Sequence, residues 1–228
     1  MSGTTENPVV DKAPEPRRRA PADTNLAVLD KLAALYPQLF GAQFLPLKRG
    51  IFQDLLQAHP EGFSADALKS ALSQHTRSSR YLSVVSQGMQ RHDLQGQPVE
   101  AMAPEHVHHA LLEVFRRRQA RSAEDLSPTL RRRMLQAFEG SGLTPEAYAA
   151  LVRSRDEASN LLLDEVLSEA RAGAARDEAL LRAFDAASQS VEAFADMYGM
   201  DGRSAALALE RARGARAAAA AAAVPPPA

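Results

Sequence analysis

The sequence predicts a mainly α-helical protein: a helical domain with a short β-hairpin, followed by a C-terminal helical extension. Hydrophobic residues make up 45% of the chain, and Ala, the strongest helix former, supplies much of that share. Apolar residues recur every three or four positions over most of the chain, as on the buried face of a helix. The stretch around Gly88–Val99 interrupts this spacing.

The composition excludes several protein classes. Cysteine is absent, which excludes disulfides and thiolate chemistry. Residues 1–25 contain no apolar run of a signal peptide. No stretch approaches the roughly 18 apolar residues of a membrane helix. By elimination we expect a cytoplasmic protein that does not contact membranes.

Charge is distributed unevenly over the chain. Residues 1–25 carry four basic and four acidic side chains, and form a polar arm with Arg17, Arg18 and Arg19 that we expect to be disordered. Residues 26–121 carry eleven Lys and Arg against eight Asp and Glu, a net charge of +3. Residues 122–228 carry twelve against sixteen, a net charge of −4. A polyanionic partner would therefore meet the segment 26–121.

The first two helices are bounded by proline. Leu26 to Tyr36 has helical spacing, with Asn25 as its expected N-cap and Pro37 ending it. A second helical segment starts at Pro46 and ends at Pro60.

Two further helices and a hairpin follow. Ser64 is expected to cap a third helix, and Thr76 or Ser78 a fourth. Residues 89–99 predict a β-hairpin with Gly96 at the tight turn. Helical spacing resumes after Pro104 and ends in a basic run, 116–121.

The composition changes after Ser122, and residues 122–202 predict an acidic helical extension. One helix is expected at about 127–138, and a second from Thr144-Pro145 to about Arg171, ending at Gly173. A third carries Leu180, Phe184, Ala187, Val191, Phe194 and Tyr198, whose spacing predicts a helix-packing seam. Residues 203–228 are an Ala/Pro-rich, low-complexity tail that we expect to fray.

Three short segments carry the functional information. They are Pro46-Leu47-Lys48-Arg49-Gly50-Ile51, Thr76-Arg77-Ser78-Ser79-Arg80-Tyr81-Leu82 and Gly88-Met89-Gln90-Arg91-His92-Asp93-Leu94-Gln95-Gly96. In order, spacing and residue type they resemble the ProQ/FinO domain of bacterial RNA chaperones. The resemblance covers residues 26–121, and a helix with Glu105-His106-Val107 completes it.

The resemblance implies a non-enzymatic RNA chaperone acting in post-transcriptional regulation. Its partners would be structured RNA: double-stranded stems, terminator hairpins, and the 3′ ends of small RNAs and mRNAs. Lys48, Arg49, Arg80 and Arg91 would supply positive charge to phosphates. For Lys48 we expect a place at the start of the second helix. For Arg80 and Arg91 an ion pair within the domain, with Asp54 or Asp93, is the alternative.

The turn from His75 to Ser79 would help to hold the RNA 3′ end. By resemblance, His75, Thr76, Ser78 and Arg80 line that pocket. His75 stands where the family usually has Tyr; it can stack on a base and can gain charge near pH 6.5. Tyr81 is expected to pack inside the domain with its hydroxyl hydrogen-bonded.

No catalytic or cofactor motif is present: the sequence lacks a nucleophile elbow, a P-loop and a dinucleotide-binding turn. His106, His108 and His109 have no metal-binding pattern, so we expect neither a metal nor a cofactor. The alternative function is a protein-interaction adaptor, with residues 122–202 binding a partner or self-associating. The opposite net charges of residues 26–121 and 122–228 also suggest a third hypothesis, autoinhibition, in which the C-terminal helices shield the basic face.

Overall fold

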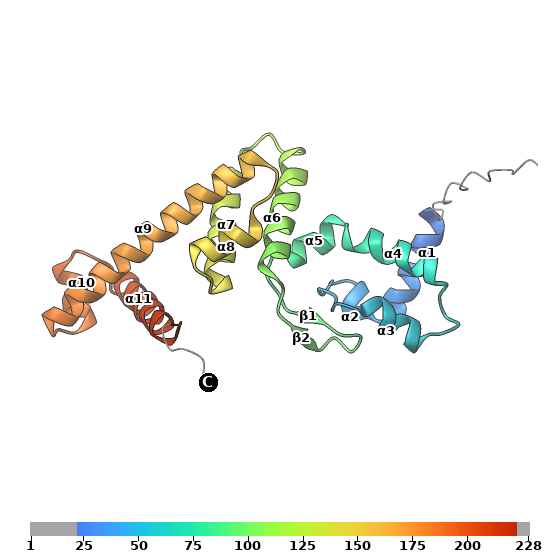
Figure 1. Cartoon of the computed structure of the whole chain (residues 1–228), viewed down its shortest axis with the longest axis horizontal. Coiled ribbons are helices and arrows are strands. Elements are labelled where there is room, and N and C mark those ends of the chain that lie inside the picture. Colours follow the sequence, from blue (N-terminus) through green and yellow to red (C-terminus); the bar gives the residue numbers. More distant parts are fainter. Residues whose placement is uncertain (1–21, 223–228) are drawn as a thin grey trace, which may run out of the picture. The chain divides into compact units, whose positions relative to one another are not determined.

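The computed structural model describes residues 22–222 (Figure 1). Most of the expected N-terminal arm, including Arg17–Arg19, lies outside the described residues. The chain divides into two compact units: residues up to 81 with 91–99, and residues 82–90 with 100 onward. The mainly helical fold with one hairpin is confirmed.

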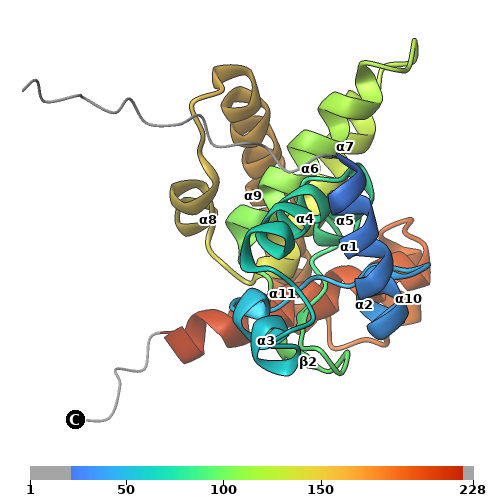
Figure 2. The same ribbon diagram turned by 90° about the vertical axis from the view of Figure 1, so that its right-hand side faces the viewer.

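The first unit contains short helices around a small apolar core. Its elements are α1 (Ala22–Leu35), α2 (Pro37–Phe40), α3 (Ile51–Ala58), α4 (Ala65–Thr76), the first residues of α5 (Ser79–Val85), β1 (Arg91–His92) and most of β2 (Pro98–Glu100). Helix α1 packs along α4 (Figure 2). Leu32, Leu55 and Leu68 from three of these helices are fully buried.

Two of the expected caps are confirmed and two are wrong. The Ser64 hydroxyl accepts a hydrogen bond from the Ala67 amide at the start of α4. The Ser78 hydroxyl accepts one from the Tyr81 amide at the start of α5. Asn25, however, lies inside α1, where it is buried and donates to Gln74. Thr76 ends α4 instead of starting α5.

The hairpin between β1 and β2 is confirmed, with Gly96 at positive φ (+75°) in its turn. The Asp93 carboxylate closes this turn by accepting hydrogen bonds from the amides of Gln95 and Gln97, at 3.0 and 2.9 Å. A Cβ at position 96 would displace only the end of the flexible Gln38 side chain in α2. The backbone conformation is therefore the reason that this position favours glycine.

The second unit is built from longer helices. They are α6 (Pro104–Gln119), α7 (Ser127–Ser141), α8 (Pro145–Val152), α9 (Glu157–Ala187), α10 (Val191–Met197) and α11 (Gly202–Ala222). Helix α6 packs against α7 and α8, and α7 also packs against α9. Met134, Tyr148 and Leu163 are fully buried among these helices.

Three helix boundaries in the extension were predicted wrongly. Helix α8 ends at Val152, because Asn160 hydrogen-bonds both the amide and the carbonyl of Ser154 and so competes with helical pairing. Helix α9 then runs through Gly173 without a break. The expected seam helix is divided at Ser188, which takes a left-handed conformation (φ 51°), and Ser190 caps α10.

The segment expected to fray is helical as far as Ala222 and packs against α9 (Figure 1). Leu209 and Ala212 of α11 form a buried cluster with Leu181 of α9. The buried alanines of α11, Ala205, Ala208 and Ala212, are three and four residues apart, and their small side chains allow α11 to approach α9 closely. Composition alone did not reveal that this face is buried.

Candidate RNA-binding surface

The segment 42–50, which connects α2 to α3, is the centre of the candidate site. Its backbone joins the hairpin: the His92 amide donates to the Pro46 carbonyl at 2.7 Å, and the Lys48 amide donates to the His92 carbonyl at 2.9 Å. Leu47 between them is buried. Gly50 then takes a positive φ (+85°) as the N-cap of α3. We call residues 42–50 the connecting segment.

Tyr81 anchors the connecting segment from α5. Its buried hydroxyl accepts a hydrogen bond from the Leu47 amide at 2.9 Å. Burial raises the pKa of this phenol, so it stays protonated at neutral pH. The expectation that Tyr81 packs inside with its hydroxyl bonded is confirmed.

Two arginines hold the same segment through its carbonyl groups. The Arg91 guanidinium donates to the Leu47 carbonyl at 2.9 Å. The Arg80 guanidinium donates to the Ala42 carbonyl and lies 4.3 Å from the centre of the Phe44 ring. The structure brings both side chains to one segment, and their charges are not neutralised by these contacts.

Lys48 lies three residues before α3, so its expected place at the start of a helix is wrong. Its ammonium forms a 2.7 Å ion pair with Asp54, and both side chains are about one-third exposed (30% and 28%). Asp54, which the sequence suggested as a partner for Arg80 or Arg91, pairs with Lys48 instead. An open hollow of about 350 Å³ lies beside this pair and is also lined by Asp93 and Gln57.

His75 is buried in an aromatic cluster and is only 4% exposed. Its ring centre lies 4.9, 4.5 and 5.1 Å from those of Phe40, Phe44 and Tyr81. Burial, with a smaller contribution from Arg80, lowers the pKa of His75 to about 4. The expectation that it gains charge near pH 6.5 is wrong, because the sequence did not show that it is enclosed.

The turn between α4 and α5 presents polar groups beside this cluster. The Thr76 hydroxyl donates back to the Leu72 carbonyl at 2.9 Å. The Ser78 hydroxyl accepts from the Tyr81 amide at 3.1 Å. Arg80 is exposed at the first turn of α5, and Arg49 is exposed on the connecting segment. The seven residues singled out from the sequence thus all lie in the first unit.

Two residues of this region were not singled out. Arg77 is exposed between Thr76 and Ser78, and its guanidinium donates to the Ser73 carbonyl at 3.0 Å. Phe44 lies between Arg80 and His75, and contacts both. Arg77 could have been found from its position within the motif segment 76–82, whereas no sequence pattern points to Phe44. Among residues 22–222 no cluster of His, Asp and Glu has the arrangement of a metal site.

Comparisons with known proteins agree with the three motif segments. The ProQ/FINO family profile matches residues 22–127. Residues 22–127 form a ProQ/FinO family domain. Over 92 residues it is 44% identical to the RNA chaperone ProQ of Shewanella oneidensis, which covers 39% of this chain and 43% of that protein. The chain therefore spans less than half the length of this curated relative.

Two solved structures are also similar to the chain. A FinO-like RNA chaperone from Neisseria meningitidis is 31% identical, covering 39% of this chain and 90% of that one, with a TM-score of 0.36. A ProQ homolog from Legionella pneumophila is 30% identical, covering 50% and 99%, with a TM-score of 0.37. ProQ/FinO chaperones are not enzymes, in agreement with the sequence.

In the described part of the chain no helix has the length and apolarity to cross a membrane.

Proposed function

We propose that this protein binds structured RNA in the cytoplasm, at terminator hairpins and the 3′ ends of small RNAs and mRNAs, and so regulates gene expression after transcription. The observation that carries the proposal is the convergence of Arg80, Arg91 and Tyr81 on the connecting segment. Both arginines donate to carbonyl groups, contacts that do not neutralise a positive charge, and guanidinium groups bind phosphate strongly.

The residues take different roles in this proposal. Arg80, Arg91, Arg49 and Lys48 face the phosphates. The Thr76–Ser78 turn and the first amides of α5 receive the 3′ end. His75, being buried, acts through its neighbours: it supports the ring of Phe44 beneath Arg80. Shape and backbone contacts, more than base edges, would define the RNA.

The test compares two arginines that are held differently. Arg80→Ala removes a carbonyl-bound guanidinium, whereas Arg153→Ala removes one that is paired with the Asp164 carboxylate. Both variants change the net charge equally. We expect Arg80→Ala to weaken binding of a terminator hairpin about tenfold, or about 1.4 kcal/mol, and Arg153→Ala to change it less than twofold.

Fluorescence anisotropy at fixed salt measures both affinities, and circular dichroism checks the fold. Lys48→Ala and Arg91→Ala should weaken binding in the same direction. Unchanged affinity in all three variants of the first unit would contradict the proposal.

A second candidate function, a protein-interaction adaptor, is favoured by exposed apolar side chains in the second unit. The exposed residues are Leu151, Leu161, Met197, Tyr198 and Leu207. Self-association through residues 122–202 would appear as a concentration-dependent mass in light scattering. Co-purified nucleic acid, seen in the ratio of absorbance at two wavelengths, would instead favour RNA binding.

A further inference from the structure

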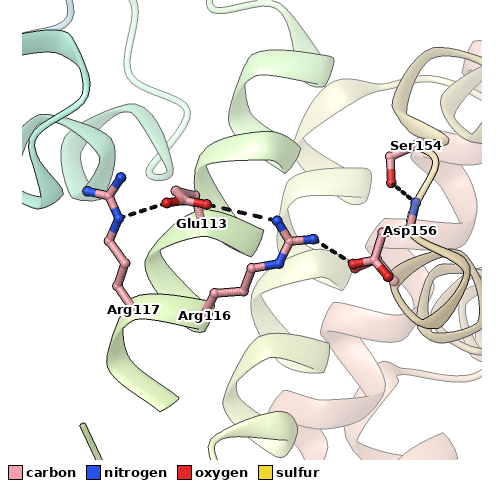
Figure 3. Close-up of polar contacts among 6 residues, drawn as sticks. Glu113, Arg116, Arg117, Ser154 and Asp156 are labelled. Atoms are coloured by element: carbon pink, nitrogen blue, oxygen red, sulfur yellow. Dashed lines mark hydrogen bonds and ion pairs between the residues drawn. The ribbon is translucent and has the colours of Figure 1, made fainter. Parts of the chain in front are cut away.

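The arginines of α6 and α7 fall into two groups. Arg116, Arg117 and Arg131 form ion pairs: Arg116 with Asp156 and Glu113, Arg117 with Glu113, and Arg131 with Glu165 and Glu169. Figure 3 shows Glu113 between Arg117 and Arg116, and Arg116 reaching Asp156. Their charges are neutralised within the second unit.

Arg118 and Arg132 behave differently. Both are exposed, and neither forms an ion pair with a carboxylate among residues 22–222. They lie close enough to Arg133 to act on it: burial, and then repulsion from Arg118 and Arg132, lowers the pKa of its guanidinium. Arg118 and Arg133 line one hollow and Arg132 neighbours Arg133 in α7, and within residues 22–222 no carboxylate forms an ion pair with any of the three.

Arg133 is fixed in place at the centre of this group. Its guanidinium donates to the Ser86 hydroxyl at 2.9 Å and to the Ser86 carbonyl at 3.2 Å. It lines two hollows, one of about 100 Å³ shared with Arg118 and one of about 460 Å³ shared with Gln87, Gln136 and Ser141. The larger hollow is lined in part by polar groups that can hydrogen-bond, whereas the smaller one is lined mainly by apolar side chains between the two arginines.

We propose that Arg118, Arg132 and Arg133 form a second phosphate-binding surface, which contacts the backbone of the same RNA. This inference rests on the proposed function and extends it to α7, which lies almost entirely beyond the family match. Holding like charges together costs free energy that a phosphate backbone offsets, because each neutralised phosphate also releases counterions. Forked guanidinium donors fit phosphate oxygens.

The experiment uses the full chain and two charge-matched double variants. Arg118→Gln with Arg132→Gln removes the two exposed, carboxylate-free arginines. Arg116→Gln with Arg131→Gln removes two ion-paired arginines from the same helices. Affinity for a terminator hairpin with a 3′ single-stranded tail is measured by fluorescence anisotropy at several salt concentrations, and thermal unfolding checks each fold.

We expect the first double variant to bind about tenfold more weakly, as for two exposed charge contacts. The slope of log affinity against log salt should fall by roughly 1.4 to 1.8, or about 0.7 to 0.9 per lost phosphate contact. The control should keep the wild-type slope.

Equal affinities and slopes in the two double variants, with the wild type binding RNA, would overturn the second surface alone. A wild type that does not bind the hairpin would overturn the proposed function, and this surface with it.

Discussion

Cations are held differently in the two units, and the difference shows where a polyanion can bind. In the first unit Lys31, Arg77, Arg80 and Arg91 donate to backbone carbonyl groups, contacts that fix the side chains without neutralising them. Lys48 forms an ion pair with Asp54.

In the second unit many arginines form ion pairs with carboxylates. Arg211 pairs with Asp177, and Arg216 pairs with Glu178 and Asp185, so that α11 is joined to α9 by opposite charges. Arg171 pairs with Glu146 in the same way. Many acidic groups of the extension are thus already satisfied there, which weakens the idea that they shield the basic face. The net charge of a segment therefore predicts polyanion binding less well than the partner of each arginine side chain does.

The largest expected effect separates packing from RNA binding. Leu209→Ala in α11 removes a side chain that is 1% exposed against Leu181 of α9. We expect the free energy of unfolding to fall by about 3 kcal/mol, because a buried cavity is created. Chemical denaturation measures the loss. RNA affinity at 20 °C should stay within twofold, and a parallel loss of affinity would show that the two units do not act separately.

His75 of the first unit and His108 of the second are both buried, and we expect both to respond to pH in the same direction. Burial lowers the pKa of His75 and of His108 to about 4, from the usual value of 6.5. Because the folded state disfavours protonation, this contribution to stability is full above pH 6.5 and is lost as the pH falls toward 4. Each histidine should cost about 3 kcal/mol over that window.

Thermal unfolding between pH 7 and pH 4.5 tests this expectation. His75→Phe, which keeps an aromatic ring in the cluster, should reduce the slope of stability against pH. A variant with the wild-type slope would contradict the assignment to His75. His106→Gln is the matched control, because His106 is exposed.

The smallest expected effect concerns the ion pair between Lys48 and Asp54 in the first unit. Asp54→Asn removes the carboxylate that pairs with Lys48 while nearly keeping its shape. We expect hairpin affinity to rise by about twofold to fivefold, since an exposed ion pair is worth less than about 1 kcal/mol. Lys48→Ala should move affinity the other way. Weaker binding by Asp54→Asn would show that the pair serves to place Lys48.

Element type was predictable from the sequence wherever local signals were strong. Ser64, Thr144 and Gly96 identified two helix starts and a turn, because each acts through its own backbone. The family motif identified Arg80 and Arg91 but not their partners. Those partners are carbonyl groups 38 and 44 residues away along the chain, and a carbonyl has no signature in a sequence.

The misplaced boundaries have physical causes of the same kind. Gly173 was taken as a helix end, yet α9 continues through it, because packing against neighbouring helices outweighs the roughly 1 kcal/mol that a helical glycine costs. His75 was assigned to the surface because it stands at an RNA-facing position of the motif. Enclosure by three rings depends on the tertiary fold, so residue type alone could not reveal it.

The main-chain attachment of the connecting segment has a consequence for how binding preference can change. Arg80, Arg91 and Tyr81 hydrogen-bond to backbone groups of Ala42 and Leu47. Every amino acid has these groups, except that proline lacks the amide hydrogen. Ala42 and Gln43 are exposed, so their side chains can be exchanged without loss of these backbone hydrogen bonds. A library randomised at these two positions would vary the RNAs selected on an unaltered scaffold.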